Sequence, residues 1–236
     1  MRAAGVRRFG DPVEVLALPG PRGLWPDEVL IDVRASGVGN WDEFARTGDW
    51  DLGIRPPMAL GVEAAGHVAA VGDRVAGVRA GDRVTTHSVP LRGQGAWAEQ
   101  HIAAADHEAV LPPGVSFEAA AALPVPALTA DQVIGDALEV RAGQTVLVHG
   151  AGGVTGGMLV RLATITADLP AAERDITMQA VQVAADGTRL GRLVRLLAQG
   201  LLTVPVDGSF PLERAGAPLA RARQGAHGSV IVLKIA

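Results

Sequence analysis

Three regularly spaced glycines, Gly150, Gly153 and Gly156, are the residues in this chain that most directly suggest chemistry. They follow a short apolar run at residues 145–150 (TVLVHG) and precede a segment that favours a helix. Between a strand and a helix, such glycines allow a tight turn, close approach of a pyrophosphate and close helix–strand packing. The helix N-terminus offers free N–H groups to phosphates, and Thr155 adds a hydroxyl. The alternative is a structural turn that binds nothing.

The missing residue types restrict the other chemistry that is available. The sequence contains no cysteine and no tyrosine, and its single lysine is Lys234. Disulfides, thiolate zinc sites and a cysteine nucleophile are therefore excluded. Acid–base steps must use His, Asp, Glu, a hydroxyl or a cofactor. No two histidines are spaced four residues apart, so we expect them to bind no metal.

Composition narrows the class of protein and of partner. A hydrophobic share of 48% and a charged share of 19% indicate a globular chain, long enough for one large or two modest domains. The net charge of -4 and the lack of a basic cluster argue against nucleic acid as a partner. No apolar run reaches the roughly 18 residues of a membrane span. We therefore expect a cytoplasmic protein that acts on a small molecule.

Turn signals and hydrophobic spacing predict a β-rich part followed by a mixed part. Segments rich in Val, Ile and Thr between Gly, Pro and Asp predict strands as far as about Pro112. One helix interrupts them over residues 40–50, with Asn40 suited to capping it. An alanine-rich helical stretch over residues 116–138 predicts the domain boundary. The later elements are expected as a helix from Val154 to Ala163, a strand or mixed segment over 178–187, a helix over 188–200, a strand over 201–207, a helix over 211–225 and a strand over 228–236.

Several longer stretches together resemble one known family. These are MRAAGVRRFGDPVEVLALP at the start, ASGVGNWDEFARTGDW with its Asn-x-Asp pattern, ALGVEAAGHVAAVG with its G-x-E-x-x-G-x-V pattern, and the C-terminal LLTVPVDGSFPLERAGAPLARARQGAHGSVIVL. The chain resembles the medium-chain dehydrogenase/reductases, in particular their zinc-free quinone oxidoreductase (zeta-crystallin-like) branch, which includes enoyl reductases. The resemblance implies an α/β plus β fold, in which a GroES-like β-barrel catalytic domain (1–124 plus 203–236) is joined to a truncated Rossmann-type doubly wound domain (125–202).

The resemblance also implies roles for individual residues. Asn40 and Asp42 would line the substrate and nicotinamide cleft, and Thr129 would lie near the cofactor. The residues implied under the pyrophosphate are Gly150, Gly153, Val154, Thr155 and Gly156. The implied reaction transfers hydride from NADPH to a quinone or an α,β-unsaturated carbonyl. Simpler roles stay open, because Asn40 and Thr129 could each cap a helix and Asp42 could support a first turn.

Zinc is not expected. The zinc branch of this family binds its catalytic metal through a Cys near Gly39 and a His directly before the hairpin glutamate. Here that His position is Val62, and the chain has no cysteine. Glu63, which matches the hairpin glutamate, is either structural or catalytic, and without a metal the structural role is favoured.

The resemblance breaks after the glycine turn. A doubly wound domain needs well over about 120 residues, more than the chain has after Thr145. We interpret this as an internal deletion of several βα units. Glu173 and Asp175 lie about 20 residues beyond the glycines, where a ribose ligand would be counted, but no second strand precedes them. A shortened sheet would expose apolar edges, which predicts a homodimer.

Two other functions remain open at this stage. A redox-inactive relative, such as a cyclase, an isomerase or a binding protein, would keep the barrel cleft around Asn40, Asp42 and Trp41 without using a nucleotide. A purely structural role as the partner of a longer homologue is the third possibility. The intact glycine array favours the oxidoreductase.

Overall fold

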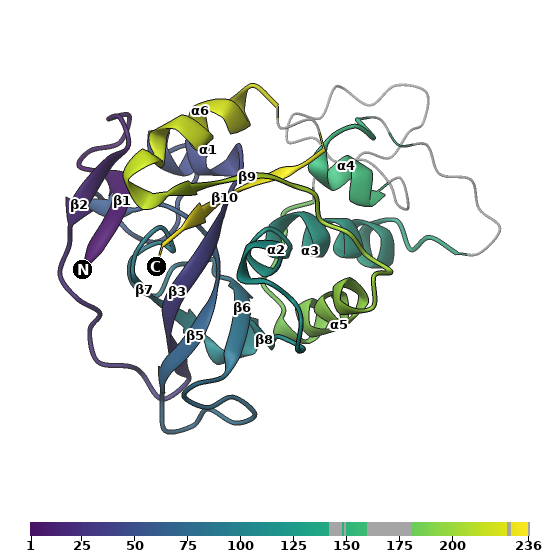
Figure 1. Ribbon diagram of the computed structural model, residues 1–236, viewed down its shortest axis with the longest axis horizontal. Coiled ribbons are helices and arrows are strands. Elements are labelled where there is room, and N and C mark those ends of the chain that lie inside the picture. The colour runs from purple at the N-terminus through teal and green to yellow at the C-terminus, as the bar shows by residue number, and fades with distance from the viewer. Residues whose placement is uncertain (142–147, 149, 160–180, 226–227, 236) are drawn as a thin grey trace.

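A computed structural model describes residues 1–141, 148, 150–159, 181–225 and 228–235. In this part of the chain, ten strands form a three-stranded and a seven-stranded sheet (Figure 1). The strands are β1 Arg2–Val6, β2 Glu14–Ala17, β3 Glu28–Val38, β4 Met58–Ala59, β5 Glu63–Val71, β6 Arg83–His87, β7 Gln100–Ala104, β8 Glu108–Val110, β9 Val206–Pro211 and β10 Val230–Lys234.

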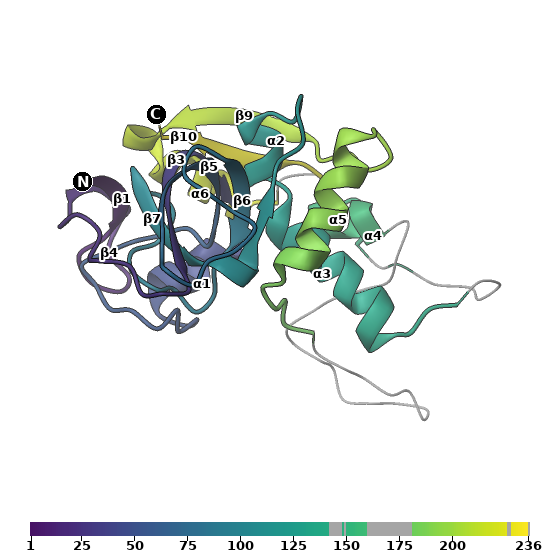
Figure 2. The same ribbon diagram turned by 90° about the horizontal axis from the view of Figure 1, so that it is seen from below.

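Helices from both halves of the chain surround the sheets. They are α1 Trp41–Thr47, α2 Phe117–Ala121, α3 Pro124–Gln132, α4 Val154–Leu159, α5 Gly187–Ala198 and α6 Gly216–Arg223, with 3-10 turns at Ala105–His107 and Leu212–Arg214 and a π-helical turn at Val133–Ala137. Helices α2, α3, α4 and α5 gather on one side of the β-rich part, while α1 and α6 lie side by side across one end of it (Figures 1 and 2).

Strand β3 organises the larger sheet. The strand order is β8-β6-β5-β3-β10-β9, and β7 also pairs with β3. The first half of β3 pairs antiparallel with β7, and its end pairs antiparallel with β10, where Ile231 lies opposite Val38. The C-terminal strand therefore returns to the N-terminal β-rich part, next to the end of β3.

Two helices show how the local sequence sets the boundaries of the elements. Helix α1 ends at Gly48, whose φ of 89° is the left-handed conformation that glycine adopts without strain. Helix α5 begins after Asp186, whose carboxylate accepts a hydrogen bond from the Arg189 backbone N–H at 2.9 Å. Its buried face carries Leu190, Leu193 and Val194, so hydrophobic contacts hold the helix in place.

The buried side chains form two large apolar clusters. The first fills the β-rich part around Ile31, Leu60 and Trp97, which are all fully buried. The second lies beneath α2, α3 and α5, around Leu123 and Leu190. The β-rich part and the group of helices around α3 therefore each have an apolar core.

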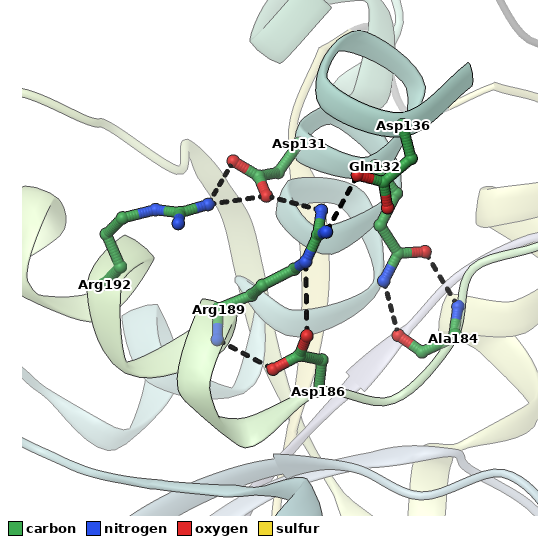
Figure 3. A network of polar contacts seen from close by, with 7 residues as sticks. All are labelled: Asp131, Gln132, Asp136, Ala184, Asp186, Arg189 and Arg192. Atoms are coloured by element: carbon green, nitrogen blue, oxygen red, sulfur yellow. Dashed lines mark hydrogen bonds and ion pairs between the residues drawn. The ribbon is translucent and has the colours of Figure 1, made fainter. Parts of the chain in front are cut away.

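A polar network fastens α5 and the segment before it to α3 (Figure 3). The Gln132 side chain donates to the Ala184 carbonyl at 2.7 Å and accepts from the Ala184 backbone N–H at 2.9 Å. The Arg189 guanidinium pairs with three carboxylates, those of Asp131, Asp136 and Asp186. This arrangement satisfies backbone groups that no strand partner reaches.

The structure confirms several predicted elements and corrects others. β3, α1, α5, α6 and β10 lie where the sequence predicts them. The helical stretch from residue 116 is divided, because α2 ends at Ala121 and α3 starts at Pro124, a residue suited to a first turn. The strand expected over residues 201–207 begins only at Val206. Residues 181–186 have no regular secondary structure, and most of the strand expected over 145–150 lies outside the described residues.

Candidate active site

One cleft brings together three segments that are far apart in the sequence. It has a volume of about 240 Å³ and lies between the end of β3, the glycine turn before α4 and the connection from α6 to β10. Its lining residues are Val38, Gly39, Asn40, Trp41, Gly153, Val154, Thr155, Gly156, Ala222, Gly225, Ser229 and Val230. Five of the residues predicted for the site therefore meet in this cleft: Asn40, Gly153, Val154, Thr155 and Gly156.

The glycine turn has the geometry that its sequence predicts. Gly150 has a φ of 82°, and its carbonyl accepts a hydrogen bond from the Gly153 backbone N–H at 3.0 Å. A side chain at Gly156 would overlap that same carbonyl, so the start of α4 packs directly on the turn. Glycine is thus required for the tight turn at Gly150 and for close packing at Gly156. Binding of a pyrophosphate by this turn stays a prediction.

Asn40 lies at the cleft, and its side chain does not cap α1. It occupies the N-cap position, but its backbone is helical (φ -66°, ψ -22°) and its side chain makes no capping bond. The residue is exposed at the cleft. The capping interpretation is therefore wrong, and the Asn40 amide remains available to a ligand.

Asp42 lies beneath the cleft wall and does not line the cleft. Its side chain is fully buried, and one carboxylate oxygen accepts a hydrogen bond from the Gly39 backbone N–H at 2.9 Å. Burial raises the pKa of Asp42 to about 7, although the backbone amides of Gly39 and Gly61 oppose that rise. The prediction that Asp42 lines the cleft is therefore corrected. The buried Asp42 side chain instead holds the backbone of Gly39, the residue before Asn40. Whether Asp42 takes part in catalysis stays a prediction.

Thr129 is also set back from the cleft. It lies inside α3, 9% exposed, and its hydroxyl donates to the Val125 carbonyl at 2.6 Å. A cap at the start of this helix is therefore excluded. Its expected position near a cofactor stays a prediction.

Glu63 has a structural connection that supports the favoured interpretation. Its Oε2 accepts a hydrogen bond from the Val125 backbone N–H at 2.9 Å, so it caps the first turn of α3 from the β-rich part. Burial raises the pKa of Glu63 well above its ordinary value. The Val125 N–H opposes this rise, and the Asp42 charge adds to it. Glu63 therefore joins α3 to β5, and its burial favours the neutral form of the acid.

The sequence did not indicate the third wall of the cleft. Residues of the α6–β10 connection, including Ser229, lie near the glycine turn, and a side chain at Gly228 would come within 3.1 Å of the Gly152 carbonyl. The predicted return of the C-terminal strand was the only available signal of this neighbourhood. Glu173 and Asp175, the residues counted as possible ribose ligands, lie outside the described residues.

Neither a metal cluster nor a membrane-spanning helix occurs in the part of the chain that the structure describes. The described residues contain no group of three or more His, Asp or Glu side chains arranged to hold a metal ion. None of the helices described is long and apolar enough to cross a membrane.

Comparisons with known proteins define the class of this chain. Residues 25–115 match the alcohol dehydrogenase GroES-like domain. A quinone oxidoreductase from Lama guanicoe is 41% identical over 160 residues, which is 66% of this chain and 47% of the relative. The synaptic vesicle membrane protein VAT-1 homolog from Danio rerio is 32% identical over 197 residues, 84% of this chain and 37% of the relative. The chain thus spans less than half of the length of these curated relatives.

Solved structures show the same fold. The quinone oxidoreductase from Coxiella burnetii superposes with a TM-score of 0.85 at 20% identity, over 100% of this chain and 99% of that one. A mycobacterial protein solved in complex with NADPH gives a TM-score of 0.77 at 21% identity. The expected combination of a GroES-like domain with a Rossmann-like domain is confirmed.

The chain belongs to the medium-chain dehydrogenase/reductase superfamily. Within that superfamily it falls in the quinone oxidoreductase branch. The precise domain boundaries and the internal deletion stay predictions from the sequence.

Proposed function

We propose that this protein is an oxidoreductase that binds NADPH at the glycine turn and reduces a quinone or an α,β-unsaturated carbonyl without zinc. The cleft carries the proposal, because it brings Asn40 together with Gly153, Thr155 and Gly156. The names of the quinone oxidoreductase relatives and of the NADPH-bound structural neighbour support the choice of reaction and cofactor.

The residues of the cleft fit a nicotinamide dinucleotide at its phosphate end. Gly150, Gly152 and Gly153 carry no side chains, so a phosphate can approach their backbone closely, and the N–H groups at the start of α4 suit a phosphate. Thr155 adds a hydroxyl in the same cleft. Bound NADPH would supply the hydride. The chain itself contributes binding and orientation.

Asn40 is the residue proposed to act on the substrate. Hydride addition to an enone or a quinone leaves negative charge on a carbonyl oxygen, and an amide N–H stabilises that charge. The lining residues include no acid and no histidine, so the balancing proton comes from water or from the hydroxyls of Thr155 and Ser229. Zinc is not needed for this step, and Val62 occupies the position of the metal-binding histidine.

Titration of NADPH and NADH into the purified protein tests the proposal, with tryptophan emission and melting temperature as readouts. Saturable micromolar binding is expected. The Gly156→Ala variant should bind at least about tenfold more weakly, because its methyl group overlaps the Gly150 carbonyl. Gly152→Ala is the matched control, since a methyl group there meets no atom within 4 Å.

Turnover with quinones and enones tests the role of Asn40. Asn40→Ala should lower kcat at least about tenfold while leaving NADPH affinity nearly unchanged. If the wild-type protein binds neither nucleotide at millimolar concentration, the oxidoreductase proposal is wrong and the alternative of a redox-inactive binding protein or isomerase takes its place.

A further inference from the structure

The wall segment, residues 37–40 at the end of β3, is held by two buried carboxyl groups. Asp42 accepts a hydrogen bond from the Gly39 N–H at 2.9 Å. Glu63 lies so close to Gly37 that a side chain at Gly37 would overlap its Oε1. A third contact restrains the segment: the Gly37 carbonyl accepts a hydrogen bond from the Trp97 indole N–H at 3.0 Å. The position of Asn40 therefore depends on both acids.

Glu63 also connects the wall segment to the opposite side of the cleft. Its Oε2 caps α3 at Val125, and α3 packs against α4, the helix that follows the glycine turn. Its backbone carbonyl accepts a hydrogen bond from the Ser36 hydroxyl at 2.5 Å, just before the wall segment. One side chain thus contacts both the wall segment and the support of the glycine turn.

Neither acid has enough hydrogen-bond partners to offset the free-energy cost of burying its charge. Among the described residues, Asp42 Oδ1 and Glu63 Oε1 are buried without a hydrogen-bond partner. An Asn or Gln side chain would accept the same backbone bonds without the desolvation cost of a carboxylate. The hydrogen bonds of this wall therefore require an acceptor at each position, and Asp42 adds a group whose charge changes with pH.

We propose that Asp42 and Glu63 are paired positioning residues, which set the position of the wall segment, and hence of Asn40, opposite the glycine turn. The pair acts through the backbone and touches neither substrate nor cofactor. This proposal depends on the proposed function only in experiments that measure turnover or nucleotide binding.

The charge on Asp42 is the variable part of this pair. Burial raises the pKa of Asp42 to about 7, so its ionisation falls near neutral pH, while burial favours the neutral form of Glu63. Ionised Asp42 strengthens the bond to the Gly39 N–H and repels any charge on Glu63.

Other titratable groups near the pair do not neutralise Asp42. His87 of β6 lies opposite Glu63 in register, and burial lowers the pKa of His87 to about 4, so its ring is neutral. The charged groups on α1 and on α6, which packs against it, are Glu43, Arg46 and Arg223, and both arginines pair with Glu43.

Tryptophan emission of the free protein tests the proposal without any ligand. The Trp41 ring packs directly on Gly39, so its emission reports on the wall segment. The wild-type protein should show a step in emission with a midpoint near pH 7. Asp42→Asn, which keeps an acceptor for Gly39, should lack the step, whereas Trp41→Phe should only reduce it, because Trp97 also contacts the wall segment. Asp49→Asn, at an exposed aspartate of the same region, is the control and should keep the step.

The remaining variants separate positioning from folding. Asp42→Ala should change Trp41 emission at every pH, because the bond to Gly39 is lost. Glu63→Gln should behave like the wild type, and Glu63→Leu should not. A step that survives in Asp42→Asn, or a wild-type spectrum in Asp42→Ala, overturns the proposal.

Nucleotide affinity is the second readout. Asp42→Asn should bind NADPH within about threefold of the wild type at pH 6, and Asp42→Ala about tenfold more weakly. Equal affinities of the wild type and Asp42→Ala contradict the proposal. If the wild type binds no NADPH, the proposed function fails, and the emission experiment still decides the role of the pair.

Discussion

Replacing His101 by Asn should change how the stability of this protein depends on pH. His101 lies on β7 and is 1% exposed. Its Nδ1 lies 3.0 Å from the Gln94 carbonyl, so Nδ1 carries the proton and donates, and its Nε2 is buried without a partner among the described residues. An Asn side chain can donate the same hydrogen bond through its amide and cannot be protonated in this pH range.

The size of the effect follows from the two pKa values. Burial lowers the pKa of His101 from its ordinary 6.5 to about 4. Between these values the unfolded chain binds more protons than the folded one, so the free energy of unfolding falls as the pH falls from 6.5 towards 4. The loss is about 2 kcal/mol at pH 5 and about 3 kcal/mol once both states are protonated. It is absent above pH 7.

Urea unfolding at pH 7.5 and pH 5.0 measures this difference. At pH 7.5, His101→Asn should be less stable than the wild type by about 1 kcal/mol, because the smaller side chain leaves a cavity. At pH 5.0 it should be more stable, and the change between the two pH values should be about 2 kcal/mol. His67→Asn, at a half-buried ring, is the control. If the wild type and His101→Asn lose equal stability between the two pH values, the reasoning is refuted.

Three further predictions concern two residues of the helical part, Arg189 and Thr129, and the oligomeric state of the chain. Arg189→Ala should lower the free energy of unfolding by about 2 kcal/mol, because three carboxylates lose their shared partner, whereas Arg192→Ala should cost under about 1 kcal/mol; urea titration compares them. Thr129→Val should leave the melting temperature within a few degrees, and it should weaken NADPH binding if Thr129 contacts the cofactor. The chain should elute from size exclusion as a homodimer, and a stable monomer of 24.2 kDa would contradict this prediction.

Strong local signals made much of the fold predictable. The alternating pattern of β3, the capping Asp186 of α5 and the C-terminal apolar strand each specify their element with little help from the rest of the chain. The late start of β9 was not predictable in this way. Residues 201–205 have the apolar composition of a strand, but β9 has its partner, β10, only from Val206 onward.

The sequence allowed us to predict which residues form the site better than it allowed us to predict how they are arranged. The glycine spacing identified the turn, because tight turns and close packing leave a local signature. The burial of Asp42 has no such signature, since an Asp two residues after a potential cap also suits an exposed first turn. The contact of the α6–β10 connection with the glycine turn depends on tertiary packing, so spacing along the chain does not reveal it.

The support of the glycine turn comes largely from the β-rich part and from side chains. Helix α3 packs against α4, and it is itself capped by Glu63 of β5 and bound to Ala184 through Gln132. Such bonds can hold a short segment in place where no neighbouring strand is paired with it. In the described part of the chain, the position of the turn is therefore coupled to the barrel through Glu63, the same residue that contacts the wall segment. Asn40 and the glycines therefore share a cleft whose two sides are connected through one buried side chain.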